Sequence, residues 1–118
     1  MSHIQEILQK KERRREKLES SLASIANQLR RVGARKIILF GSLAKNDVDV
    51  ASDLDLLVIM PSTRSGKEWM RLIYDDVERG VASDLLVYNE DEFQEDLPVS
   101  SLLQNIANSG KVVYEETA

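Results

Sequence analysis

Two short, mostly apolar segments constrain the fold more than any other feature of the sequence. They are residues 36–40 and 54–60, and a polar spacer separates them. Apolar runs of this length, bounded by turn-forming residues, are typical of buried β-strands. The first segment leads directly into Gly41 and Ser42, and the second begins beside Asp53 and Asp55. Each predicted strand therefore carries polar residues at one end, where a site can form at the edge of the core.

The two aspartates predict a metal site. Residues two positions apart on a strand point to the same face, so Asp53 and Asp55 would lie side by side. Neighbouring carboxylates repel each other, and unpaired charge is costly beside a segment as apolar as residues 56–60. A divalent cation resolves this conflict, because Mg²⁺ binds one or two protein carboxylates and completes its coordination with water and phosphate oxygens. A solvated strand end is the simpler alternative.

Gly41 and Ser42 fit a phosphate site at the same place. Glycine allows the backbone to approach a ligand closely. A serine at the start of a helix offers a hydroxyl and nearby free N–H groups to a phosphate. A phosphate cradle beside metal-binding carboxylates is the equipment for transfer from a nucleoside triphosphate. On its own, Gly-Ser after a strand is often only a turn and an N-cap.

In this order and spacing the motifs resemble the minimal nucleotidyltransferases of the DNA polymerase β-like superfamily, over residues 29–114. The family has a third acidic residue on a later strand, and Asp84 matches it. The family also tends to close with a helix, a glycine and a short strand, which residues 102–114 match. The resemblance implies a nucleotidyltransferase fold of the α/β (α+β) class, with a small mixed β-sheet, flanking helices and a long N-terminal helix.

The segment after Gly-Ser departs from the family pattern. Where the family commonly has Arg-Ala-Arg-Gly, this chain has Leu43, Ala44, Lys45 and Asn46. Lys45 keeps a positive charge but not the planar fork of arginine. Asn46 tolerates a left-handed turn almost as glycine does. Leu43 removes one cationic group.

The resemblance implies a Mg²⁺-dependent enzyme that moves a nucleoside monophosphate, most simply AMP from ATP, to a hydroxyl acceptor. The residues implied to hold two Mg²⁺ ions and to carry catalysis are Asp53, Asp55 and Asp84. The residues implied to bind the triphosphate of ATP or another NTP are Gly41, Ser42 and Lys45.

The acceptor is expected on a partner protein, because a chain of 118 residues leaves little room for a second, acceptor-binding domain. Stand-alone relatives resemble the antitoxin halves of toxin–antitoxin pairs, in which the partner is a helical HEPN-type ribonuclease that they adenylylate on a tyrosine. The resemblance thus implies a HEPN-like partner. The alternative is a non-catalytic antitoxin or scaffold that neutralises such a partner by contact.

Residues 3–32 are predicted to form one long helix, because no glycine or proline interrupts them and an apolar seam runs along residues 18–32. We therefore divide the chain into an N-terminal helix, residues 1–32, and a minimal nucleotidyltransferase domain, residues 33–118. The seam could cover the sheet or close a homo-oligomer, and the first half of the helix is expected to leave the domain. The basic run of residues 10–17 contains glutamates and favours a solvated face over an RNA site.

Further helices are predicted at residues 67–79 and 99–108, with strands at 81–88 and 111–114. The inward face of the first of these helices is expected to carry Met70, Ile73, Tyr74 and Val77. Trp69 is expected at the helix edge, with stacking on a nucleotide base as the alternative. Asp84 is expected to be buried within its strand.

The composition limits where in the cell the protein is expected and which partners it is expected to bind. The chain has no cysteine, and no run approaches the roughly 18 apolar residues of a membrane span. No signal peptide is recognised, so we expect a cytoplasmic protein that does not enter a membrane. The net charge of −4 argues against nonspecific binding of nucleic acid over the whole protein surface.

Overall fold

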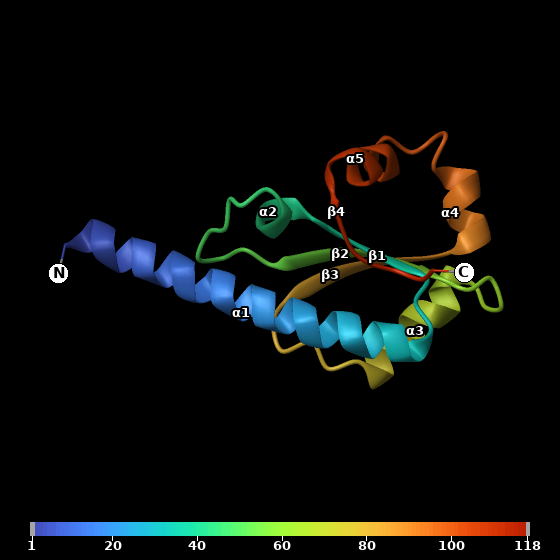
Figure 1. Ribbon diagram of the computed structural model, residues 1–118, viewed down its shortest axis with the longest axis horizontal. Coiled ribbons are helices and arrows are strands. Elements are labelled where there is room, and N and C mark those ends of the chain that lie inside the picture. The colour runs from blue at the N-terminus through green and yellow to red at the C-terminus, as the bar shows by residue number, and fades with distance from the viewer. Residues whose placement is uncertain (1, 118) are drawn as a thin grey trace.

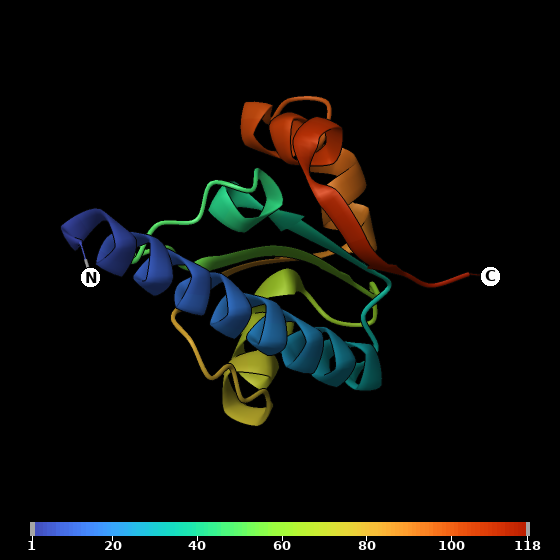
Figure 2. The same ribbon diagram turned by 60° about the vertical axis from the view of Figure 1, so that its left-hand side comes forward.

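A four-stranded mixed β-sheet forms the centre of the molecule, with helices on both faces (Figures 1 and 2). The structure is a computed structural model that describes residues 2–117. The strand order is β3 (Ser83–Asn89), β2 (Leu54–Met60), β1 (Lys36–Phe40), β4 (Lys111–Glu115). Strands β2 and β3 are parallel, whereas β1 is antiparallel to both β2 and β4. The predicted small mixed sheet with flanking helices is therefore confirmed.

Two apolar clusters attach the helices to the sheet. The helices are α1 (His3–Val32), α2 (Gly41–Ala44), α3 (Gly66–Asp76), α4 (Glu90–Asp96) and α5 (Ser101–Ser109). Helices α1 and α3 share the larger cluster with residues such as Leu54 and Leu56 of β2. Helix α5 shares the smaller cluster with Leu57, and α4 supplies Phe93 beside it. Successive residues of β2 thus alternate between the two faces, as strand geometry requires.

Helix α1 belongs to the core through its second half only. Leu18, Ile25 and Leu29 are fully buried on the sheet. The N-terminal turns project beyond the sheet (Figure 1), and Ile4 and Leu8 are 69% and 58% exposed there. The helix begins with a capping box at Ser2 and ends at Gly33. The second half of α1 thus packs on the sheet; a homo-oligomer through this helix stays a prediction.

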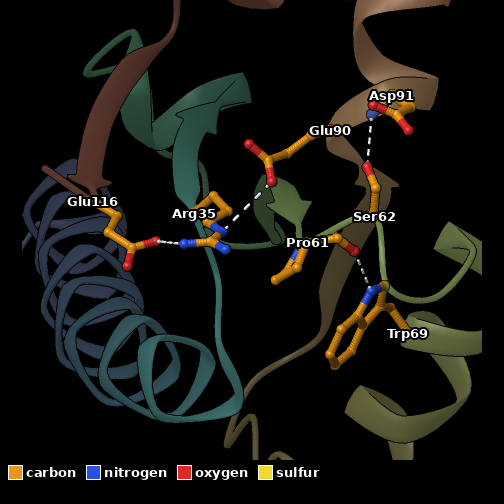
Figure 3. A network of polar contacts seen from close by, with 7 residues as sticks. All are labelled: Arg35, Pro61, Ser62, Trp69, Glu90, Asp91 and Glu116. Atoms are coloured by element: carbon orange, nitrogen blue, oxygen red, sulfur yellow. Dashed lines mark hydrogen bonds and ion pairs between the residues drawn. The ribbon is translucent and has the colours of Figure 1, made fainter. Parts of the chain in front are cut away.

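The predictions for α3 were wrong in two respects. The helix ends at Asp76 rather than Arg79, because Val77 is extended, with φ −100° and ψ 121°, and buries its side chain. The inward face carries Trp69, which is 7% exposed, whereas Tyr74 is 47% exposed. The Trp69 Nε1–H donates to the Pro61 carbonyl at 2.8 Å (Figure 3), which makes burial of the indole favourable.

The remaining boundaries differ from the predictions by a few residues. The strand expected at residues 81–88 starts at Ser83. Residues 77–82, between α3 and β3, form a loop that lies beside α1. Helix α5 starts at Ser101 rather than near Val99, because the Ser100 side chain accepts a hydrogen bond from the Leu103 N–H and caps the helix. No helix within residues 2–117 is both long and apolar enough to cross a membrane.

Candidate functional site

The three predicted carboxylates lie at one end of the sheet. Strands β2 and β3 are parallel and start at the same edge, and their register pairs Asp55 directly with Asp84. Asp53 lies two residues before Asp55 in the chain, immediately before β2. The sequence could place Asp53 beside Asp55, but only the parallel pairing of two strands separated by α3 brings Asp84 to the same place.

Gly41 fixes this site from the other side of Asp55. Strand β1 pairs with β2, and its last residue, Phe40, is the register partner of Asp55. Gly41 follows with φ +77°, and a Cβ added there would lie 2.1 Å from the Asp55 Oδ2. A side chain at this position would therefore be strained by the backbone conformation and would require the Asp55 carboxylate to move. Gly41 thus lies against Asp55, and the phosphate and metal site predicted from these residues stays a prediction.

The segment after Gly41 forms the short helix α2. Ser42 is half-buried, and Lys45 is exposed at the end of the helix. Leu43 is 7% exposed and packs in the larger apolar cluster. Asn46 has φ +57°, which agrees with its expected left-handed conformation. Leu43 thus adds to the core rather than to the site.

The electrostatics of the site centre on Asp55. Burial raises the pKa of its carboxyl group above the ordinary value, and the negative charges of Asp84 and Asp53 raise it further. Asp53 and Asp84 are both exposed. The expectation that Asp84 is buried was wrong, because β3 is an edge strand and Asp84 is only its second residue.

Sequence reasoning missed Arg14, which reaches the site from α1. Its Nε–H donates to the Ser52 carbonyl at 2.8 Å, and its Nη2 lies 3.7 Å from the Asp53 Oδ1. The basic run around it indicated a solvated face. The available signal was its spacing, because Arg14 precedes the buried Leu18 by four residues and so lies on the same face of the helix.

The three predicted metal ligands lie at the same end of the sheet, but their carboxylates are not close enough to one another to form a metal site. Among residues 2–117, no group of three acidic, histidine or cysteine side chains is close enough to hold a metal ion. Repulsion between carboxylates favours such separation, and Arg14 attracts Asp53 toward α1. The donor chemistry still fits a divalent cation, because Asp55 has a raised pKa, lies beside two further carboxylates at this end of the sheet and has no cationic partner within the described residues.

A cavity of about 450 Å³ lies at the end of the sheet opposite to the three aspartates. It is lined by Ile59, four residues along β2 from Asp55, and by Arg35. Arg35 pairs with Glu116 and, at 3.5 Å, with Glu90, as Figure 3 shows. The hydrogen bond that the Arg35 guanidinium donates to the Glu116 carboxylate is the main cause of the raised pKa of Arg35. Both cations that line the cavity, Arg35 and Lys36, are thus already paired within the protein, and the cavity is separate from the three aspartates.

Comparisons with known proteins identify the family of the chain and support its fold. A family model for the nucleotidyltransferase domain matches residues 19–113, which is most of the chain. A solved structure from Sulfolobus solfataricus, described as a candidate nucleotidyltransferase, superposes with a TM-score of 0.57 at 15% sequence identity. The match covers 93% of this chain and 87% of that chain, and it shows a shared fold. The search of curated proteins found no significant match.

Proposed function

The chain belongs to the family of nucleotidyltransferase domains, and on this premise we propose that it transfers AMP from ATP to a hydroxyl group of a partner protein. The observation that carries the proposal is the contact between Gly41 and Asp55. A residue without a side chain brings the backbone against a carboxylate of the predicted metal site, with an added Cβ only 2.1 Å from Oδ2. Such close approach suits a phosphate that contacts the backbone and the carboxylate site together.

The carboxylates would act together around the transferring phosphoryl group. Two Mg²⁺ ions held by Asp53, Asp55 and Asp84 would stabilise the charge on the phosphoryl group and on the leaving pyrophosphate. Asp55 is the central ligand in this proposal, because it lies between Gly41 and Asp84 on neighbouring strands. Asp53 can turn from Arg14 at little cost, since a half-exposed ion pair contributes about 1 kcal/mol or less.

The other residues divide between the two substrates. The Ser42 hydroxyl and the Lys45 ammonium group would bind the triphosphate on the β1 side of Asp55. On the β3 side, the exposed Asp84 would accept the proton of the acceptor hydroxyl. The acceptor oxygen forms a bond to the α-phosphorus, the bond from that phosphorus to pyrophosphate breaks, and the proton moves to Asp84.

The acceptor protein is proposed to be a helical HEPN-type ribonuclease of a toxin–antitoxin pair, modified on a tyrosine in the cytoplasm. The exposure of Asp84 on an edge strand supports a macromolecular acceptor, because a tyrosine on another protein can reach it. A contact-only antitoxin is the second candidate, supported by Leu43, which packs in the core where relatives have a cationic side chain.

The test is transfer of label from α-³²P-labelled ATP, with Mg²⁺, to a HEPN-type partner encoded beside the gene. We expect Asp53→Asn to abolish labelling and Asp47→Asn to preserve it, since Asp47 is an exposed loop residue outside the proposed site. Labelling by Asp53→Asn at the wild-type rate would overturn the assignment. A stable complex without any labelled product would favour the contact-only antitoxin.

A further inference from the structure

A groove of about 760 Å³ runs between α1 and the loop that joins α3 to β3. Figure 2 shows this loop beside the middle of α1. Gln28 fixes the loop to the helix through two hydrogen bonds with the backbone of Glu78, at 2.7 and 2.9 Å. The two walls of the groove, one from the helix and one from the loop, are therefore held together by hydrogen bonds.

The groove is cationic in an otherwise acidic protein. Arg14, Lys17 and Arg79 line it, and its lining contains no acidic residue, whereas the chain carries a net charge of −4. Within residues 2–117, Lys17 and Arg79 form no ion pair. The Arg79 guanidinium lies 4.1 Å from the centroid of the Tyr74 ring, which holds it in place. Two cations are thus available to a ligand, with Arg14 beside them.

Uncharged donors complete the lining. The Ser83 Oγ is buried and has no hydrogen-bond partner within the described part of the chain. The N–H groups of Gly80 and Val81 also donate no hydrogen bond to residues 2–117. The buried Ser83 Oγ calls for a water or a ligand group, and the more exposed N–H groups of Gly80 and Val81, which lie beside cations, favour an anion.

The groove joins the proposed active site on its acceptor side. Ser83 immediately precedes Asp84, and Arg14 contacts both the Ser52 carbonyl and Asp53. Strand β1, which carries Gly41 at its end, lies on the opposite side of β2 from β3. The groove is therefore separated from the proposed triphosphate position, and a ligand in it would lie next to Asp84.

We propose that this groove binds an acidic segment of the acceptor protein and thereby places the acceptor hydroxyl at Asp84; the inference rests on the proposed function. A peptide is favoured over a polynucleotide because the cations are few and confined. Sites for nucleic acids neutralise several phosphates in succession. Here the exposed acidic residues Asp75, Asp76 and Glu78 directly precede Arg79 in the chain and would repel an extended polyanion.

The experiment measures fluorescence anisotropy of two short peptides on the full chain. Each peptide has a central tyrosine, flanked by glutamates in one and by serines in the other. We expect the glutamate peptide to bind, more weakly as salt rises, and the serine peptide not to bind. Replacing both Lys17→Gln and Arg79→Gln should weaken binding by about tenfold, as expected when two charge contacts are lost. The matched control is Lys10→Gln, an exposed cation of the same helix outside the groove.

Three results would overturn the inference. These are equal binding of the serine peptide, equal weakening by Lys10→Gln, and tighter binding of a thymidine oligonucleotide that depends on Lys17 and Arg79. Circular dichroism of each variant verifies folding, and Lys17→Ala alone provides a second variant. Binding does not need catalysis, so groove-dependent binding without any nucleotide transfer would contradict the proposed function alone. Transfer with no groove-dependent binding would contradict this inference alone.

Discussion

Replacing Gly41 by alanine tests the geometry on which the proposed site depends. Gly41 has φ +77°, and an added Cβ would lie 2.1 Å from the Asp55 Oδ2 and 2.9 Å from its Cγ. Real Cβ atoms stay beyond about 3.0 Å from such neighbours, so one group must move by roughly 1 Å. Asp55 belongs to a strand with a partner on both sides, so the displacement falls mainly on its carboxylate.

Two costs add in Gly41→Ala. The left-handed backbone conformation costs a residue with a Cβ about 1–2 kcal/mol. Crowding against Asp55 costs about 1–3 kcal/mol more, as overpacking does elsewhere. We expect a loss of about 2–5 kcal/mol in the free energy of unfolding, which lowers Tm by roughly 10–25 °C in a domain of this size. A carboxylate misplaced by about 1 Å should also slow nucleotide transfer by roughly 100-fold.

Thermal unfolding and labelling from α-³²P-labelled ATP measure the two effects. Gly80→Ala is the matched control for stability, because Gly80 has φ +71° and an added Cβ would lie at an ordinary 3.4 Å from the Ser21 Oγ. Gly33→Ala is the control for activity, since an added Cβ there meets nothing within 4 Å. A Gly41→Ala protein that is no less stable than Gly80→Ala, or that keeps full activity, would refute the reasoning.

Two further predictions concern the charge of the site and the role of α1. Because the pKa of Asp55 is raised in the folded state, its ionisation destabilises the fold as pH rises from the unfolded value of 3.8 through the folded value. Urea unfolding should therefore show Asp55→Asn to be more stable than wild type at neutral pH, with a difference that vanishes toward low pH; equal stability at all pH values would contradict this. Leu29→Ala, at a fully buried position, should cost about 2–5 kcal/mol, while Ile4→Ala on the projecting turns should change stability by less than about 0.5 kcal/mol. Similar losses in both would show that the first turns are packed as firmly as the rest of α1.

Local sequence patterns predicted the elements that organise the fold. The strands at residues 36–40 and 54–60 were predicted with their observed bounds, because each is an apolar run that ends in turn formers or proline. The long N-terminal helix and its buried seam followed from uninterrupted helical periodicity. The spacing of Asp53 and Asp55 likewise placed both residues at the start of one strand.

Features that depend on contacts between residues distant in the sequence were harder to predict from the sequence. The face of α3 was misjudged because burial of Trp69 depends on the carbonyl of Pro61, which lies on the preceding loop. The exposure of Asp84 depends on β3 being an edge strand, which its apolar sequence does not reveal. The position of Arg14 depends on the angle at which α1 crosses the sheet. The roles of the three aspartates remain predictions for the experiments above.

The charges at the end of the sheet explain how the chain tolerates this site. Three carboxylates lie at this end of the sheet, and within residues 2–117 the one cation that pairs with them, Arg14, contacts the exposed Asp53. Asp55 therefore keeps an uncompensated charge at a partly buried position, and its pKa is raised as a consequence. Gly41 lies against that same carboxylate, where an added Cβ would be 2.1 Å from its Oδ2, so the carboxylate has little room on that side. A bound cation would gain most at Asp55, because the unfavourable charge is greatest at this partly buried carboxyl group.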